Sequence, residues 1–189
     1  MNSEKKRQDI VQAAMDLFWE WGFDKVSVDD ICKKLNISKP TLYKYVPKKE
    51  LLLAYYYQQE SIDCLPKMYD YLDQDQPKEA LQSLFLDLHR IAMEMGPELY
   101  GAYRIYTLSD QEYLSYFRYP QVRLIETCLE KLQQKKCISS RVHPHKLAMI
   151  LMDLNEGLCL SWASTKGDFD LVSTFQDYAD IVLGFSVHS

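Results

Sequence analysis

Apolar residues recur at three- and four-residue spacing along most of the chain, which is the spacing of one face of an α-helix. The first such run ends at Trp21, where Gly22 suits the left-handed backbone of a helix end. We therefore expect a first helix over about residues 3–21. No segment shows convincing apolar–polar alternation between hairpin turns, so the sequence predicts an all-α fold.

Two short helices are expected next. Ser27 and Asp30 have the three-residue spacing of a capping box, which predicts a helix over residues 28–35. Ser38 can cap a second helix over residues 39–45, because proline is tolerated in a first turn whose N–H groups have no intrahelical partner. The two helices are joined by a tight turn.

This pair has the form of a helix-turn-helix, in which the second helix enters the major groove of DNA. An ordinary helical hairpin has the same outline, but its exposed face is normally filled with Glu, Lys and Gln. Here the second helix offers one Thr, two Tyr and two Lys, and no acidic residue occurs between Asn36 and Lys49. The composition therefore favours DNA binding.

Lys48 and Lys49 stand where the next helix is expected to begin. A helix N-terminus carries partial positive charge and favours acidic side chains, so two lysines there are electrostatically unfavourable unless an anion binds. Free backbone N–H groups, the helix dipole and two ammonium groups all attract phosphate. We expect both lysines to contact the DNA backbone.

The body of the chain is predicted to hold four or five more helical stretches. The first is expected over about residues 49–72 with a kink at Pro66. The last two, residues 145–164 and 171–187, are apolar around much of their circumference, which a larger core or a dimer interface would explain. Breaks are expected at residues 73–77, 96–97, 119–120, 139–144 and 166–170.

Tyrosines concentrate between residues 94 and 120. Tyrosine combines apolar area with a hydroxyl group, which suits a ligand pocket and suits a packed helical interior equally well. Asn155 and Glu156 interrupt a mostly apolar helix, so their polar groups need partners.

Charge is distributed unevenly along the chain. Residues 1–50 contain ten Lys or Arg against eight Asp or Glu, whereas the remainder contains twelve against nineteen. This describes a small basic head on an acidic body. The charged N-terminus and the lack of a long uncharged apolar run indicate a cytoplasmic protein.

Other chemistry is poorly supported. The five cysteines are widely spread with no CxxC pair, which favours packed thiols over a redox pair. His143 and His145 resemble a metal pair, but no acidic or thiol ligand is near them in sequence. His89 is interpreted as a surface or core residue. No phosphate loop, nucleophile elbow or HExxH stretch occurs, so we expect no catalytic site, metal or cofactor.

The stretch VSVDDICKKLNISKPTLYKYVPKKELL, together with the preceding Trp-Gly-Phe, resembles the DNA-binding segment of the TetR family of bacterial transcriptional regulators. The resemblance covers about residues 5–55. It implies that the third helix reads bases and that the second and fourth helices grip phosphates. Family members usually have an aromatic residue in place of Val46 and often a capping Ser in place of Lys48, so the fourth helix is expected to lack a side-chain cap. The candidate DNA contacts are Ser27, Lys39, Pro40, Thr41, Tyr43, Lys44, Tyr45, Lys48 and Lys49.

The resemblance also implies a division into a DNA-binding domain, residues 1–48, and an effector-binding and dimerisation domain, residues 49–189. The family binds small molecules in the body, for which we expect the lining residues Leu88, Met95, Tyr103, Tyr106, Phe117 and Asn155. It forms homodimers through its last two helices, here through Leu147, Ile150, Leu154, Gly157, Leu158, Tyr178, Ile181, Val182 and Phe185.

The sequence therefore predicts a homodimeric DNA-binding transcriptional regulator. We expect it to act as a repressor that binds a palindromic operator and is released from it by a small-molecule effector. A helical adaptor that uses the same fold without an operator is the alternative, and an enzyme is the least favoured class.

Overall fold

The computed structural model describes residues 3–108 and 111–185, and gives the backbone alone over 111–120. Its helices are α1 (Ser3–Trp21), α2 (Val28–Leu35), α3 (Lys39–Tyr45), α4 (Leu51–Asp63), α5 (Leu65–Asp73), α6 (Pro77–Leu108), α7 (Gln111–Gln134), α8 (Pro144–Ser164) and α9 (Leu171–Leu183). Within these ranges strand pairing is limited to one isolated bridge, between Ile138 and Phe185. The predicted all-α class is confirmed. None of the described helices has both the length and the apolar character that crossing a membrane would need.

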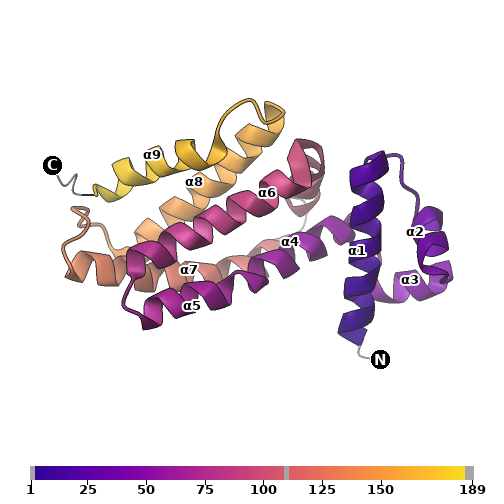
Figure 1. Cartoon of the computed structure of the whole chain (residues 1–189), viewed down its shortest axis with the longest axis horizontal. Helices are drawn as coiled ribbons and strands as arrows, with labels where there is room; N and C mark the ends of the chain where they lie inside the picture. Colours follow the sequence, from indigo (N-terminus) through magenta and orange to yellow (C-terminus); the bar gives the residue numbers. More distant parts are fainter. Residues whose placement is uncertain (1–2, 109–110, 186–189) are drawn as a thin grey trace.

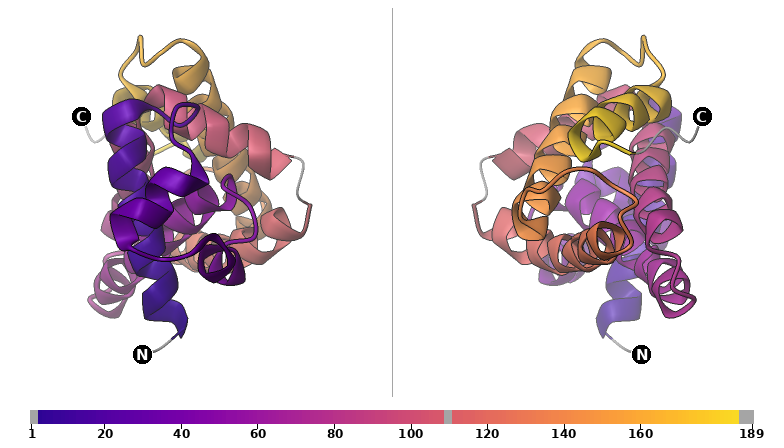
Figure 2. Two further views of the ribbon diagram at one scale, coloured as in Figure 1. Left: turned by 90° about the vertical axis from the view of Figure 1, so that its right-hand side faces the viewer. Right: turned by 90° about the vertical axis from the view of Figure 1, so that its left-hand side faces the viewer.

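The first three helices form a small head at one end of the molecule, and α4 leads from it into the body (Figure 1). Views along the long axis show the head at one end and the α7–α8 connection at the other (Figure 2). The bounds of α1, α2 and α3 agree with those expected from spacing and capping residues. One continuous cluster of buried residues runs from the head into the body.

The fourth predicted helix is two helices in the structure. The break falls at Cys64, next to Pro66, which occupies the first turn of α5 where a proline is tolerated. Helix α4 is buried through Leu52, Leu53 and Ala54, all fully inaccessible, because head and body pack against it from different sides. The position of α4 therefore determines how the head is placed relative to the body.

Helix α6 contains the expected break at Gly96, whose backbone (φ 79°, ψ 160°) is not helical and which precedes Pro97. The expected break at residues 119–120 is wrong, because α7 continues through Pro120. A proline removes one backbone hydrogen bond and can bend a helix without ending it. At the other end of the chain, α9 stops at Gly184 (φ 58°), before the predicted limit at residue 187.

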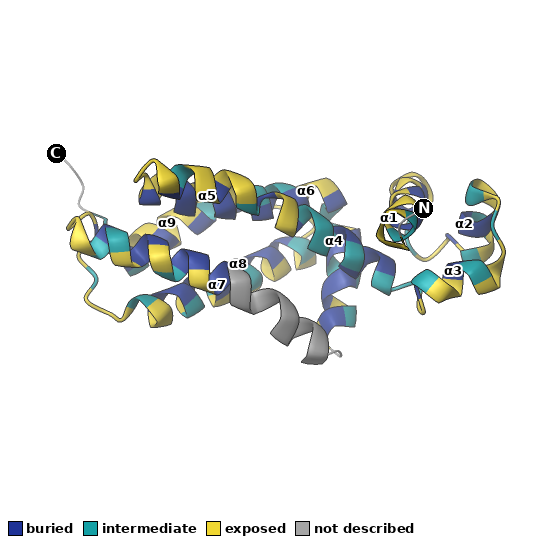
Figure 3. Ribbon diagram, turned by 90° about the horizontal axis from the view of Figure 1, so that it is seen from below, coloured by how far each residue is buried: buried dark blue, intermediate teal, exposed yellow. Residues whose placement is uncertain are grey.

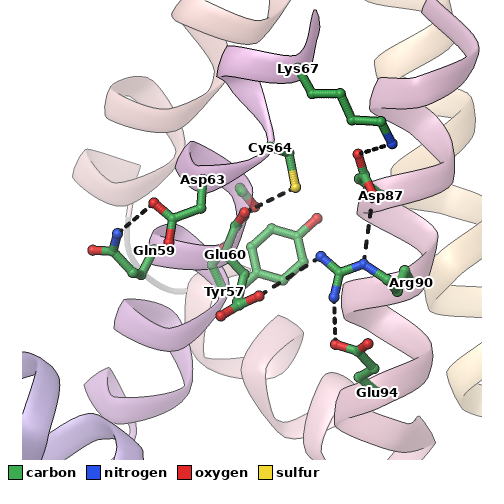
Figure 4. A network of polar contacts seen from close by, with 10 residues as sticks. Tyr57, Gln59, Glu60, Asp63, Cys64, Lys67, Asp87, Arg90 and Glu94 are labelled. Carbon is green, nitrogen blue, oxygen red and sulfur yellow. Dashed lines mark hydrogen bonds and ion pairs between the residues drawn. The ribbon is translucent and has the colours of Figure 1, made fainter.

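A polar network joins α4 and α5 to α6 (Figure 4). The guanidinium of Arg90 lies 2.7 Å from Glu94, 3.7 Å from Asp87 and 3.9 Å from Glu60. Lys67 of α5 approaches the same Asp87 at 3.4 Å. Because these groups are partly exposed, their main effect is to orient the helices, and their contribution to stability is small.

All five cysteines are free thiols, and four of them are buried, which agrees with the predicted packed state. Burial raises the pKa of Cys128 and Cys159 to about 12. Thiols with a raised pKa contain little thiolate and react slowly.

His89 of α6 is a core residue with only 1% of its surface exposed. Its ring packs edge-on against Phe175 of α9 at a centroid distance of 4.8 Å. Among the described residues no group bonds either ring nitrogen in good geometry, and the one polar interaction of the ring is a weaker hydrogen bond with the Asn155 side chain. Burial lowers the pKa of this imidazole to about 4, against a smaller opposing effect of the Asn155 side chain.

This burial makes stability depend on pH in a defined window. Between pH 6.5, where the exposed imidazole titrates, and about pH 4, the unfolded chain binds a proton that the folded chain does not. We expect the free energy of unfolding to fall as pH falls through this window, by up to about 3 kcal/mol near pH 4. Urea unfolding of wild type and His89→Gln at several pH values measures the effect. Equal pH dependence in the two proteins would contradict it.

Candidate functional site

The α2–α3 pair is positioned by side-chain caps at both helix starts. The Ser27 backbone N–H donates to Asp30 Oδ2 at 2.9 Å, and the Asp30 N–H donates to Ser27 Oγ at 3.3 Å, which completes the predicted capping box. The hydrogen bond from Ser27 holds the pKa of Asp30 below its usual value. Ser38 Oγ accepts from the Thr41 N–H at 3.3 Å. The turn between the helices uses Asn36 in the left-handed conformation, φ 50°.

Helix α3 has one buried residue, Leu42, and is exposed or half-buried along the rest of its length (Figure 3). Residues four apart share a face of a helix, so Lys39 lies above Tyr43 and Pro40 above Lys44. These four side chains are exposed. The structure therefore brings most of the predicted base-reading residues onto one outward surface, with Thr41 and Tyr45 half-buried beside it.

Lys39 has a partner inside the head that sequence reasoning did not identify. Its ammonium lies 2.9 Å from Asp29 Oδ2 of α2, with both side chains about half exposed. The hydrogen bond to Asp29 raises the pKa of Lys39. A phosphate at this position would compete with the carboxylate for the same ammonium group.

Lys48 and Lys49 differ in environment although they are adjacent. Lys48 is exposed. Lys49 donates to the carbonyl oxygens of Phe23 at 2.7 Å and Val26 at 2.9 Å, and its ammonium lies 4.1 Å from the centre of the Phe23 ring. This differs from the prediction that both lysines are held for an anion: Lys49 ties the α1–α2 connection to the start of α4.

The helix start itself also differs from the expected one. Both lysines precede α4, which begins at Leu51, and their carbonyl oxygens accept the N–H groups of Leu51 and Leu52. As predicted, no side chain caps this helix.

The head contacts the body at the break in α6. The indole N–H of Trp19 donates to the carbonyl oxygen of Glu94 at 3.1 Å, and the indole packs edge-on against Tyr56 of α4 at 5.6 Å. Carbonyl groups in the last turn before a helix break lack intrahelical partners, so the indole satisfies one of them. Helix α1 therefore rests on both helices that lead into the body.

The residues predicted to line an effector pocket lie mainly in the packed interior. Leu88, Met95, Tyr103 and Asn155 are buried, and Tyr106 is half-buried. The side chain of Phe117 lies outside the described residues. A cavity of about 320 Å³ lies between α6, α8 and α9, and none of the predicted residues lines it.

Some of these residues belong instead to a buried aromatic cluster. The Tyr103 ring stacks on Tyr57 of α4 at 4.6 Å, and Tyr100 packs edge-on against both. Beside them, Arg104 pairs with Glu156 of α8 at 3.3 Å. Arg104 is thus a partner for Glu156, whose carboxylate was expected from the sequence to need one.

The residues predicted for the dimer interface divide into two groups. Leu147 and Leu158 are 1% and 8% exposed and pack into the core of the single chain, so they offer little surface to a partner. Helix α8 is apolar on several faces, and its spacing alone does not show which face points outward. The remaining members are exposed or half-buried: Ile150, Leu154, Gly157, Tyr178, Ile181, Val182 and Phe185.

His143 and His145 do not converge on a metal site in the part of the chain that is described, where no group of three His, Cys, Asp or Glu side chains gathers. His145 Nδ1 lies 3.1 Å from Glu126 on the surface of α7. The His143 ring accepts from the His145 backbone N–H at the start of α8.

Comparison with known proteins gives two kinds of match. Residues 10–56 match the sequence profile of the bacterial regulatory proteins of the tetR family. Two Bacillus subtilis proteins are similar over a short segment: the HTH-type transcriptional regulator YuxN, 40% identical over 58 residues, and YdeS of the same type, 36% identical over 63 residues. These segments make up 29% and 33% of this chain but only 20% and 32% of the two relatives.

Similarity to a solved structure extends over almost the whole chain. The crystal structure of Thermus thermophilus FadR, described as a TetR-family transcriptional repressor in complex with lauroyl-CoA, superposes with a TM-score of 0.75 at 25% identity, covering 97% of this chain and 96% of FadR. Residues 10–56 thus match the DNA-binding domain of the tetR family, and the chain as a whole shares the fold of this TetR-family repressor.

Proposed function

We propose that this protein is a homodimeric DNA-binding transcriptional regulator, acting as a repressor that a small-molecule effector releases from its operator. The observation that carries the proposal is the outward surface of α3, where Lys39, Pro40, Tyr43 and Lys44 lie together on a helix fixed by caps and by buried Leu42. A short helix of this kind enters the major groove, and its basic ends approach phosphates.

Outward apolar surface on the last two helices supports the dimer. Ile181 of α9 is 80% exposed, Tyr178 three residues earlier on the same helix is also exposed, and Ile150 is exposed on α8. Large apolar side chains that gather on one face mark an interaction surface. In a symmetric dimer two copies of α3 would reach successive major grooves, about 34–36 Å apart, which requires a palindromic operator.

The repressor and effector parts rest on the similarity to FadR, which is a repressor and binds lauroyl-CoA. An effector acts only if it binds the two conformational states with different affinity. The contact of Trp19 with Glu94 and Tyr56 is a route by which a change in α6 or α4 would reorient the head.

Selection of bound sequences from random duplex DNA tests the proposal. We expect a palindrome with half-sites about one helical turn apart, and binding whose affinity falls steeply with salt because phosphate contacts release counterions. Absence of any enriched sequence at low salt would refute DNA-specific regulation and favour the adaptor.

Alanine variants of Lys48 and Lys49 form a matched pair, because one is expected to change binding to the operator and the other the stability of the fold. We expect Lys48→Ala to reduce the salt dependence of operator binding by about one unit of slope, with unchanged stability. We expect Lys49→Ala to lower the free energy of unfolding by about 1–2 kcal/mol, because two charge-assisted hydrogen bonds to carbonyl groups are lost. Salt titrations and urea unfolding measure the two effects. Interchanged behaviour of the variants would show that the roles are assigned the wrong way round.

The dimer surface is tested with Ile181→Lys. A charge in the centre of an apolar interface is strongly unfavourable, so we expect a shift from dimer to monomer in sedimentation velocity with unchanged helix content. Ile105→Lys is the matched control, because Ile105 is 74% exposed on α6, outside the predicted interface. Dissociation by both variants, or by neither, would argue against the α8–α9 interface.

A further inference from the structure

The two adjacent acidic residues in the first turn of α2 have different partners. Asp30 completes the capping box with Ser27, so its carboxylate is used within its own helix. Asp29 reaches across to α3, where its Oδ2 lies 2.9 Å from the ammonium of Lys39. The side chains of Asp29 and Lys39 are 55% and 51% exposed, and α2 and α3 lie at the outer end of the head (Figure 1). Both members of this ion pair are therefore accessible to a partner of the head.

The ion pair adds little to the cohesion of the two helices. Exposed ion pairs contribute little to stability, because solvent screens them and ordering two long side chains costs entropy. The arrangement of α2 and α3 already rests on the buried side chains of Ile31 and Leu42 and on the left-handed turn at Asn36. A function in binding explains an acid at this position better than a function in folding.

A carboxylate beside Lys39 opposes simple attachment to the DNA backbone. It repels the negatively charged phosphates, and it competes with them for the lysine ammonium. Asp29 therefore weakens contact with the backbone of every sequence alike. This loss is offset only where the DNA offers a group that the carboxylate itself can bind.

The major-groove edge of a G·C base pair offers such a group. It presents the N7 and O6 atoms of guanine as acceptors and the N4 amino group of cytosine as a donor. Lysine donates to the two guanine atoms, and aspartate accepts from the cytosine amino group. The ammonium of Lys39 has three protons, so it can keep its bond to Asp29 while it donates to guanine.

The pair has the capacity for this contact and the position for it. Asp29 uses Oδ2 for Lys39, and none of the described residues bonds its other carboxylate oxygen. Lys39 is the first residue of α3, and the N-terminal residues of a recognition helix contact base edges. An A·T pair fits less well, because adenine gives the ammonium one acceptor and the O4 atom of thymine is a further acceptor that repels the carboxylate.

We propose that Asp29 and Lys39 together read one G·C base pair in each half-site of the operator, with Lys39 donating to guanine and Asp29 accepting from cytosine. The inference rests on the proposed function, since it requires an operator. It adds an acidic residue of α2 to the base-reading surface of α3, and the same carboxylate disfavours other sequences.

Binding to substituted operators tests the proposal. The wild-type protein first selects its operator from random duplex DNA, and each base pair of the half-site is then replaced in turn. Fluorescence anisotropy with the full-length protein measures the affinities. We expect one G·C position at which replacement by A·T weakens wild-type binding about tenfold. In Asp29→Ala and in Lys39→Ala we expect this preference to fall below about threefold, with the other positions of the half-site unchanged.

Asp24→Ala is the matched control, because it removes the same charge from an exposed position of the head. We expect this variant to change affinity for all sequences alike and to keep every base preference of the wild type. Circular dichroism establishes that each variant is folded, and Lys39→Ala decides the question if Asp29→Ala is not.

The outcomes separate this inference from the proposed function. Unchanged preferences at every position in folded Asp29→Ala would overturn the inference and leave the regulator intact, as would a relaxed preference at an A·T position. Selection of no operator by the wild-type protein would overturn the regulator and the inference together.

Discussion

Burial of α4 from two sides is the constraint on which the arrangement of this molecule depends. Leu52, Leu53 and Ala54 have no accessible surface, because the head covers one part of the helix and the body another. Close-packed interiors do not deform continuously, so a shift of α4 must be accompanied by a shift of its neighbours. The head therefore has no freedom to reorient independently of the helices beneath it.

The break in α6 extends this constraint to a second helix. Gly96 and Pro97 interrupt the helix where the Trp19 indole reaches the Glu94 carbonyl oxygen. The Glu94 side chain belongs to the Arg90 network, which also includes Glu60 of α4. Two routes thus join α1 to the body, one apolar through Tyr56 and one polar through Glu94, and both end on the same pair of helices.

Sequence reasoning succeeded where structure is determined by neighbouring residues. The bounds of α2 and α3 followed from Ser27, Asp30 and Ser38, because caps act within one turn. It failed where the outcome depends on contacts distant in sequence. The carbonyl partners of Lys49 lie 23 and 26 residues away, in a connection whose conformation no local pattern specifies. The sequence equally could not predict that Leu147 points inward, since α8 is apolar on several faces.

The ion pair between Lys39 and Asp29 bears on how salt dependence should be interpreted. A lysine that moves from solvent to a phosphate displaces a cation from the DNA, and this release produces the dependence on salt. Lys39 leaves behind a carboxylate, which then attracts a cation of its own. Uptake of a cation at Asp29 offsets release of a cation from the DNA. The net number of cations released on binding would therefore be smaller than the number of phosphate contacts. An acidic residue in the head thereby makes attachment to DNA less sensitive to the ionic conditions around it.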